Sequence, residues 1–312
     1  MEGPTPGPLL ATGIPNLDLV LGGGVPEGDV LLVVGPAGAG KTTLSFQMLV
    51  HAAASGQNVL YVATLSEPPS KLLRHLRSYT FYDERFIGKR LFLLNTYPLL
   101  TQSLDALTDA LVSAVKEHQA TLVVVDGMMT IHDLHPASAE FRQFVYELGA
   151  ILAAQGCTTV VTTGEIPREL EYQFPEFTMA DGVVELGTEN VGTRTTRTLR
   201  VRKLRGQSPL LGQHLLRIDD AGLTVFPRPE SVIPMANVGL SPARVSIGLP
   251  VLDTLMHGGP HRGSITLLAG SLGTGKTLSC LEFLMDGANR GEKGLLLGFR
   301  ETPRQLLDKA RA

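Results

Sequence analysis

A glycine-rich segment, GPAGAGKT at residues 35–42, carries the residues best suited to phosphate chemistry. It fits the pattern GxxxxGK[ST] and follows the apolar run 30–34, the strand-then-helix context of a phosphate-binding loop, or P-loop. Glycines let backbone N–H groups converge on phosphates, and the positive end of the following helix adds to the attraction. Lys41 would reach the β and γ phosphates, and the Thr42 hydroxyl would ligate Mg²⁺. The predicted site for ATP comprises Gly35, Gly38, Ala39, Gly40, Lys41, Thr42 and Thr43.

Two acidic residues follow predicted strands and could complete this site. Asp126 ends the apolar run of TLVVVDG, at the carboxyl edge where parallel sheets bind their ligands, so we expect it to hold Mg²⁺ together with Thr42. Glu67 stands just past a predicted strand at 58–64 and could orient or activate water for hydrolysis. The alternative for Glu67 is a solvated loop charge before two prolines.

A basic cluster lies between residues 194 and 205, namely Arg194, Arg197, Arg200, Arg202, Lys203 and Arg205. It could be a solvated strand face, a nucleic-acid patch, or an arginine finger that reaches a neighbour's phosphates. Strict alternation puts Lys203 and Arg205 on the packed face of Leu199 and Val201, opposite Arg200 and Arg202. Cations that switch to the packed face favour a specific contact.

The same motifs recur later in the chain at a constant offset of 235 (276 − 41). Gly13 matches Gly248, Asp18 matches Asp253, and a second P-loop spans 270–277. We therefore expect two tandem copies of one domain, the second cut short at Ala312 and lacking the sheet neighbours that would bury its apolar runs. The predicted nucleotide contacts of the second copy are Gly273, Gly275, Lys276 and Thr277.

Strand and helix patterns alternate along the first copy, which predicts a three-layer α/β fold with a mostly parallel sheet. The expected strands are 29–34, 58–64, 91–94, 121–126 and 158–163. A helical stripe of Leu104, Leu107, Leu111 and Val115 should face the core. After residue 182, short strands predict an antiparallel extension of the sheet. The expected divisions are a tail at 1–8, an ATPase domain at 9–228, a linker at 229–243 and an incomplete second domain at 244–312.

The composition favours an ordinary globular protein without a global charge field. The 27 Lys and Arg residues against 30 Asp and Glu residues give a net charge of −3, so any binding to nucleic acid or membrane must be local. We expect no membrane segment and no signal peptide, and hence a cytoplasmic location. Cys157 and Cys280 should be buried small hydrophobes, and His132 with His135 should be loop residues rather than metal ligands.

The motifs TGIPNLD, TLSEPP, TLVVVDG, TTVVTTGE and KLRG, together with the P-loop, resemble those of the KaiC family of the RecA superfamily. The resemblance implies a RecA-like fold and a hexameric ring with nucleotide between subunits. It also implies that Lys203 and Arg205 reach the neighbour's γ-phosphate and that Thr163 lies near the site. Where KaiC has paired glutamates, this chain has Ser66 before Glu67, and Arg300 before Glu301.

The resulting hypothesis is a ring-forming signalling or timing ATPase that uses ATP and Mg²⁺. One alternative is a fragment of a KaiC-type serine/threonine autokinase, although the segment that carries the family's phosphorylated pair is absent here. Another is a DNA-handling RecA-like motor or recombinase. Against nucleic acid stand the low aromatic content of 5% and an acidic loop after the strand 158–163, with Glu165, Glu169, Glu171, Glu176 and Asp181 against Arg168.

Overall fold

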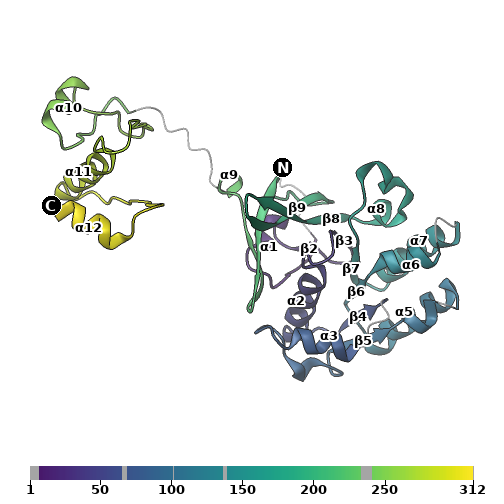
Figure 1. Cartoon of the computed structure of the whole chain (residues 1–312). Helices are drawn as coiled ribbons and strands as arrows, with labels where there is room; N and C mark the ends of the chain where they lie inside the picture. Colours follow the sequence, from purple (N-terminus) through teal and green to yellow (C-terminus); the bar gives the residue numbers. More distant parts are fainter. Residues whose placement is uncertain (1–6, 65–68, 101, 136–138, 233–240, 312) are drawn as a thin grey trace. The chain divides into compact units, whose positions relative to one another are not determined.

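The computed structural model describes residues 7–64, 69–100, 102–135, 139–232 and 241–311 (Figure 1). The chain divides into two compact units, Met1–Pro234 and Met235–Ala312. Within the described residues, no helix is both long enough and apolar enough to cross a membrane.

The first unit is built on a nine-stranded sheet in the order β11-β10-β9-β8-β3-β7-β6-β4-β5. Six strands run parallel: β3 (Val30–Val34), β4 (Val59–Ala63), β5 (Leu91–Asn95), β6 (Leu122–Asp126), β7 (Thr158–Thr163) and β8 (Gly182–Val191). Three antiparallel strands extend it: β9 (Arg194–Leu204), β10 (Gln213–Asp219) and β11 (Gly222–Phe226). Strands β1 (Leu9–Leu10) and β2 (Val25–Pro26) form a separate pair. The predicted parallel sheet with its antiparallel extension is confirmed.

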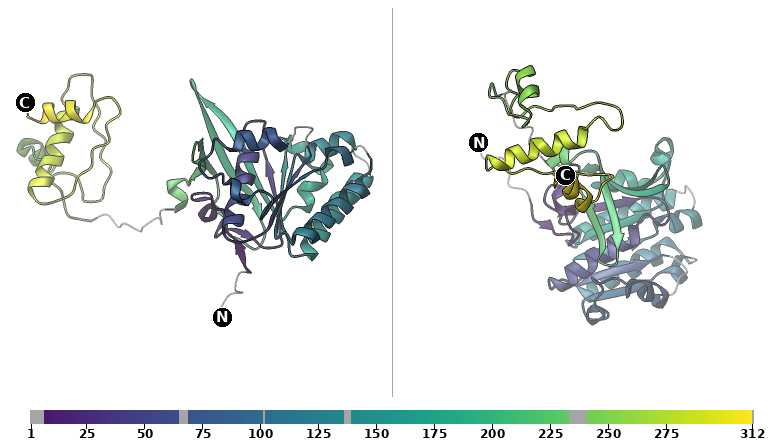
Figure 2. Two further views of the ribbon diagram at one scale, coloured as in Figure 1. Left: turned by 90° about the horizontal axis from the view of Figure 1, so that it is seen from below. Right: turned by 60° about the vertical axis from the view of Figure 1, so that its left-hand side comes forward.

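Helices cover both faces of this sheet, so the unit has three layers (Figure 2). Helices α1 (Leu17–Leu21), α2 (Lys41–Ala54) and α3 (Pro69–Leu76) pack on one face. The other face is covered by α4 (Tyr97–Leu100), α5 (Leu104–His118), α6 (Met128–Leu134), α7 (Ala139–Ala154) and α8 (Pro175–Met179). The predicted leucine stripe of α5 lies in this second core. Central strands such as β3 and β6 are buried on both faces, as parallel strands between helical layers must be.

Short helical segments occupy the connections. They are η1 (Glu84–Phe86), η2 (Arg168–Gln173) and α9 (Pro229–Val232). Segment η2 and helix α8 together form the acidic connection between β7 and β8. This connection begins at the carboxyl edge of the sheet beside the P-loop and ends at the opposite edge, where Asp181 contacts the first residue of β3.

A β-bulge in the pairing of β8 with β9 changes which cation faces the core. Val184 pairs with Val201, but Val183 pairs with Lys203, so one extra residue of β9 lies between these pairs. Leu204, rather than Lys203, therefore continues the buried row of Leu199 and Val201. The prediction from strict alternation that Lys203 shares the face of Val201 was wrong, because a bulge shifts the alternation by one residue.

The second unit contains three helices within residues 241–311: α10 (Pro250–Leu255), α11 (Lys276–Asn289) and α12 (Pro303–Arg311). Its only strand pairing in that range is an isolated bridge between Arg244 and His261. The segments that correspond to β3 and β4 are unpaired, and their apolar side chains, such as Ile265 and Leu295, are exposed. Cys280 is also exposed, which corrects the prediction of a buried thiol, because no sheet covers this helix.

Candidate nucleotide-binding site

The P-loop connects β3 to α2 at the carboxyl edge of the sheet. Gly35 has no room for a side chain, because a Cβ there would lie 2.4 Å from the carbonyl oxygen of Leu186 on the adjacent β8. Gly40 has a φ of 108°, a left-handed conformation that glycine adopts without strain and that ends the loop where α2 begins. The tight loop therefore presents backbone N–H groups at the N-terminus of a 14-residue helix.

Lys41 is folded back onto its own loop. Its Nζ donates to the carbonyl oxygens of Gly35 at 2.6 Å and Pro36 at 3.0 Å. Burial lowers the pKa of Lys41, and the nearby carboxylate of Asp126 partly offsets this shift. The ammonium group thus lies inside the loop, where a phosphate could take the place of the two carbonyl partners.

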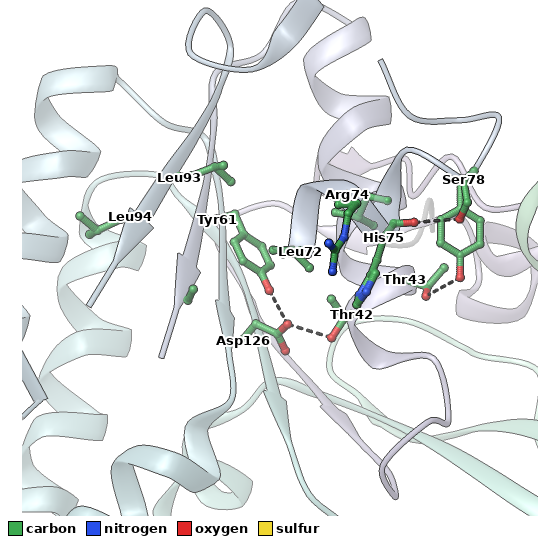
Figure 3. Close-up of a pocket in the computed structure, with 13 residues that line it drawn as sticks. Thr42, Thr43, Tyr61, Leu72, Arg74, His75, Ser78, Leu93, Leu94 and Asp126 are labelled. Carbon is green, nitrogen blue, oxygen red and sulfur yellow. Dashed lines mark hydrogen bonds between the residues drawn. The ribbon is translucent and has the colours of Figure 1, made fainter. Parts of the chain in front are cut away.

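Asp126 lies beside the P-loop and is tightly held. Its Oδ2 accepts hydrogen bonds from Thr42 Oγ1 at 2.9 Å and from the Tyr61 hydroxyl at 2.5 Å. Its Oδ1 accepts from Thr162 Oγ1, and the backbone N–H of Gly127 donates to the same threonine at 3.0 Å. Asp126 is 6% exposed, and side chains of the two neighbouring strands and of α2 set the orientation of its carboxylate. Its contacts with Tyr61 and Thr42 are drawn in Figure 3.

Two of these contacts were not predicted from the sequence. Tyr61 on β4 and Thr162 on β7 hold Asp126 from both sides because β6 lies between those strands. The register pairs Asp126 with Thr162 and with Ala63, which places Tyr61 two residues before Ala63 on the same face of the sheet. The sequence did not predict these two contacts because it did not reveal that β6 lies between β4 and β7.

A hollow of about 310 Å³ lies over the P-loop, and it brings in a residue of the basic cluster. Arg197 of β9 lines this hollow together with Tyr79, which stacks on Phe81 at a ring separation of 5.1 Å. The Nε atom of Arg197 is buried and has no hydrogen-bond partner among the described residues. The sequence placed Arg197 only in the basic cluster, and the structure places it beside the P-loop.

Thr163 faces away from these groups. Its hydroxyl lies 3.4 Å from Oε1 of Glu176 on α8, on the opposite side of the sheet from the contact of Thr162 with Asp126. Glu176 is fully buried, and burial raises the pKa of its carboxyl. Within the described residues, the second carboxyl oxygen of Glu176 has no partner. The structure thus brings Thr162, rather than Thr163, to the side chains of the P-loop site.

Lys203 and Arg205 lie at the end of the sheet where the parallel strands begin, opposite the end that carries the P-loop. Lys203 Nζ donates to the carbonyl oxygen of Ala180 at 2.5 Å, and Arg205 pairs with Asp181 at 2.6 Å. The same Asp181 carboxylate accepts from the backbone N–H of Val30, the first residue of β3. Burial and the neighbouring Arg205 lower the pKa of Lys203. Both cations are therefore at the start of β3, whereas the P-loop follows its end.

The acidic connection and the basic strand neutralise one another in part. Glu171 makes a bidentate ion pair with Arg202 at 2.7 Å, and Glu185 lies 3.7 Å from the same guanidinium. Asp181 is likewise paired, and Glu176 is buried. Three acids of the predicted acidic loop are thus used inside the unit, and Arg202 does not form a free basic patch.

The remaining predicted residues lie apart from this site. Glu67 lies outside the described residues, and its counterpart Glu301 pairs with Lys309. His132 lies in helix α6 rather than in the predicted loop, and its ring is tilted against that of Phe174 at a ring separation of 4.5 Å. His135 lies 3.1 Å from the carbonyl oxygen of Leu100. Within the described parts of the chain, no group of three His, Cys, Asp or Glu side chains is arranged to hold a metal.

The second P-loop repeats the local geometry of the first. Lys276 Nζ donates to the carbonyl oxygens of Gly270 at 2.7 Å and Ser271 at 2.6 Å. Gly273 and Gly275 have φ values of 82° and 84°. Thr277 follows in the first turn of α11, but residues 241–311 provide no counterpart of Asp126.

The fold and the site define a P-loop nucleotide-binding domain of the RecA-like class, because the glycine loop joins a central parallel strand to a helix with a strand-terminal aspartate beside it. The family model described as "ATPase: KaiC" matches residues 10–230 and 245–312. The chain therefore belongs to the KaiC ATPase family.

Curated relatives carry the name circadian clock oscillator protein KaiC. The protein of Acaryochloris marina is 31% identical over 308 residues, which are 95% of this chain and 58% of that protein. The protein of Synechococcus elongatus is 31% identical over 312 residues, which are 96% of this chain and 59% of that protein. The chain thus spans less than two thirds of the length of these relatives.

Proposed function

We propose that the first unit binds ATP with Mg²⁺ and hydrolyses it as a ring-forming signalling or timing ATPase. The observation that carries this proposal is the 2.9 Å hydrogen bond between Thr42 of the P-loop and Asp126 at the end of β6. This bond brings together two oxygen ligands beside a loop shaped for phosphates. Glu67 is proposed to orient the attacking water.

The chemistry of these side chains fits a magnesium ion. Mg²⁺ prefers hard oxygen ligands and retains several waters, and the Thr42 hydroxyl and Asp126 carboxylate provide such oxygens. When bound, the ion would neutralise charge on the β and γ phosphates. Tyr61 and Thr162 would keep the carboxylate oriented toward Thr42, and Lys41 would exchange its carbonyl partners for phosphate oxygens.

We propose that Lys203 and Arg205 act on the nucleotide of a neighbouring subunit. They lie at the start of β3, and their own P-loop follows its end. A five-residue strand spans about 15 Å, which is too far for contact with the phosphates of the same chain. A head-to-tail ring would bring the start of β3 in one subunit close to the P-loop of the next. The family resemblance makes six subunits the expected ring size.

Mixed rings of two inactive variants test both parts of this proposal. Lys41→Ala should abolish turnover, and Arg205→Ala should reduce it by about 10³-fold or more. In an equal mixture, about a quarter of the interfaces combine an intact Lys41 with an intact Arg205, so about a quarter of the wild-type rate should return. Full activity of Lys41→Ala alone would refute the nucleotide site. A mixture no more active than its components would refute the contribution from the neighbour.

A further inference from the structure

A hollow in the first unit extends from the P-loop site to helix α3. It has a volume of about 590 Å³, and one wall contains Thr42, Tyr61 and Asp126. The opposite wall contains side chains of α3, among them Leu72 and Arg74. The metal-site residues and α3 therefore face a common space (Figure 3).

Helix α3 is anchored to the core and places Arg74 at this space. Leu76 is buried, and Leu72 and Leu73 pack against the same core cluster as α2. This packing fixes α3 beside the P-loop, and the guanidinium of Arg74 extends into the hollow (Figure 3). A long cationic side chain on an anchored helix is thus directed toward the groups that would surround a bound phosphate.

Arg74 differs from the next cation of this segment. Within the described residues, its guanidinium makes no hydrogen bond and no ion pair. Arg77, one turn further on, instead pairs with Glu84 outside the hollow. Of these two arginines, only Arg74 lines the hollow and has all its donors available.

The charges of the site leave room for such a cation. Beside the P-loop, Lys41 and Arg197 carry positive charge and Asp126 carries negative charge, which leaves one net positive charge. A triphosphate with one Mg²⁺ still carries net negative charge, which a guanidinium can bind through two parallel hydrogen bonds. We infer that Arg74 binds the terminal phosphate of the nucleotide held by its own chain, as a further catalytic residue. This inference rests on the proposed nucleotide site.

Binding of ADP and of a non-hydrolysable ATP analogue separates this role from a general effect on the pocket. Calorimetry with Mg²⁺ would compare wild type, Arg74→Ala and the matched control Arg77→Ala. Loss of a charge-assisted contact to the terminal phosphate should weaken binding of the ATP analogue by about tenfold or more. Binding of ADP should change by less than about twofold, since ADP lacks that phosphate. Arg77→Ala should change neither affinity.

Turnover provides a second readout on the same variants. Arg74→Ala should lower kcat, and Arg74→Lys should recover part of it, because lysine keeps the charge but loses the bidentate geometry. If Arg74→Ala weakened the binding of ADP and of the ATP analogue equally, or left the affinity for the ATP analogue unchanged, the proposed role of Arg74 would be overturned. A wild-type protein that binds neither nucleotide would instead overturn the proposed function itself.

Discussion

Replacement of Tyr61 by phenylalanine would remove one hydroxyl from the site and leave the aromatic ring in place. The hydroxyl donates to Oδ2 of Asp126 at 2.5 Å, and both side chains are buried, with exposed fractions of 4% and 6%. The ring packs against Phe46 at a separation of 5.3 Å, a contact that the phenylalanine would keep. The substitution therefore isolates the hydrogen bond, without opening a large cavity.

The expected loss follows from the charge and burial of the acceptor. A hydrogen bond to a charged group contributes about 1.5–3 kcal/mol, and its removal leaves Asp126 with Thr42 and Thr162. For a unit of this size, a loss of that magnitude lowers Tm by about 3–12 °C. Side chains that orient a metal ligand affect metal affinity by about 10–100-fold. Magnesium-dependent nucleotide binding should weaken to a similar degree.

Thermal denaturation followed by circular dichroism, with Mg²⁺ titrations in the presence of nucleotide, would measure both effects. Tyr79→Phe is a suitable control, because its hydroxyl lies 3.4 Å from that of neutral Thr43 and should contribute below about 0.5 kcal/mol. If Tyr61→Phe were as stable as Tyr79→Phe and bound Mg²⁺ equally well, the hydroxyl of Tyr61 would have no part in holding Asp126.

Three further predictions concern other parts of the chain. Burial raises the folded-state pKa of Glu176, so its contribution to stability is complete below the unfolded pKa of about 4.3 and is lost as pH rises through the folded pKa. Glu176→Gln should therefore gain stability relative to wild type with rising pH, and a pH-independent difference in denaturation midpoint would contradict this. Gly35→Ala should lose nucleotide affinity in calorimetry, because its Cβ would lie 2.4 Å from the Leu186 carbonyl oxygen, and unchanged affinity would show that the loop can shift. Limited proteolysis should cleave within 264–300 before it cleaves the first unit, because apolar side chains there are exposed, and an uncut second unit would be the opposite result.

Local patterns in the sequence were sufficient to predict the parallel sheet. The strands predicted at 29–34 and 121–126 correspond to Val30–Val34 and Leu122–Asp126, because buried parallel strands appear as continuous apolar runs. The spacing of leucines on α5 also identified its core face, since helical periodicity depends only on near neighbours. Such signals are contained in short segments and need no knowledge of the partner strands.

Predictions from the sequence pattern failed where the burial of a side chain depended on a neighbouring strand or sheet. The bulge in β9 arises in its pairing with β8, and it moved Leu204 rather than Lys203 into the buried row. Likewise, Cys280 lies in an apolar sequence but is exposed, because burial requires a sheet to pack against.

By itself, the sequence determined the P-loop, the strand-terminal Asp126 and the KaiC family, because each is specified by residue types at short spacing. Only the tertiary structure showed that Tyr61 and Thr162 hold Asp126 and that Arg197 lies over the P-loop. These residues are far apart in the chain and meet because of the strand order β7-β6-β4 and the extension through β9. The physical reason is that a side chain's neighbours across a sheet are set by strand order and register, which no local pattern specifies.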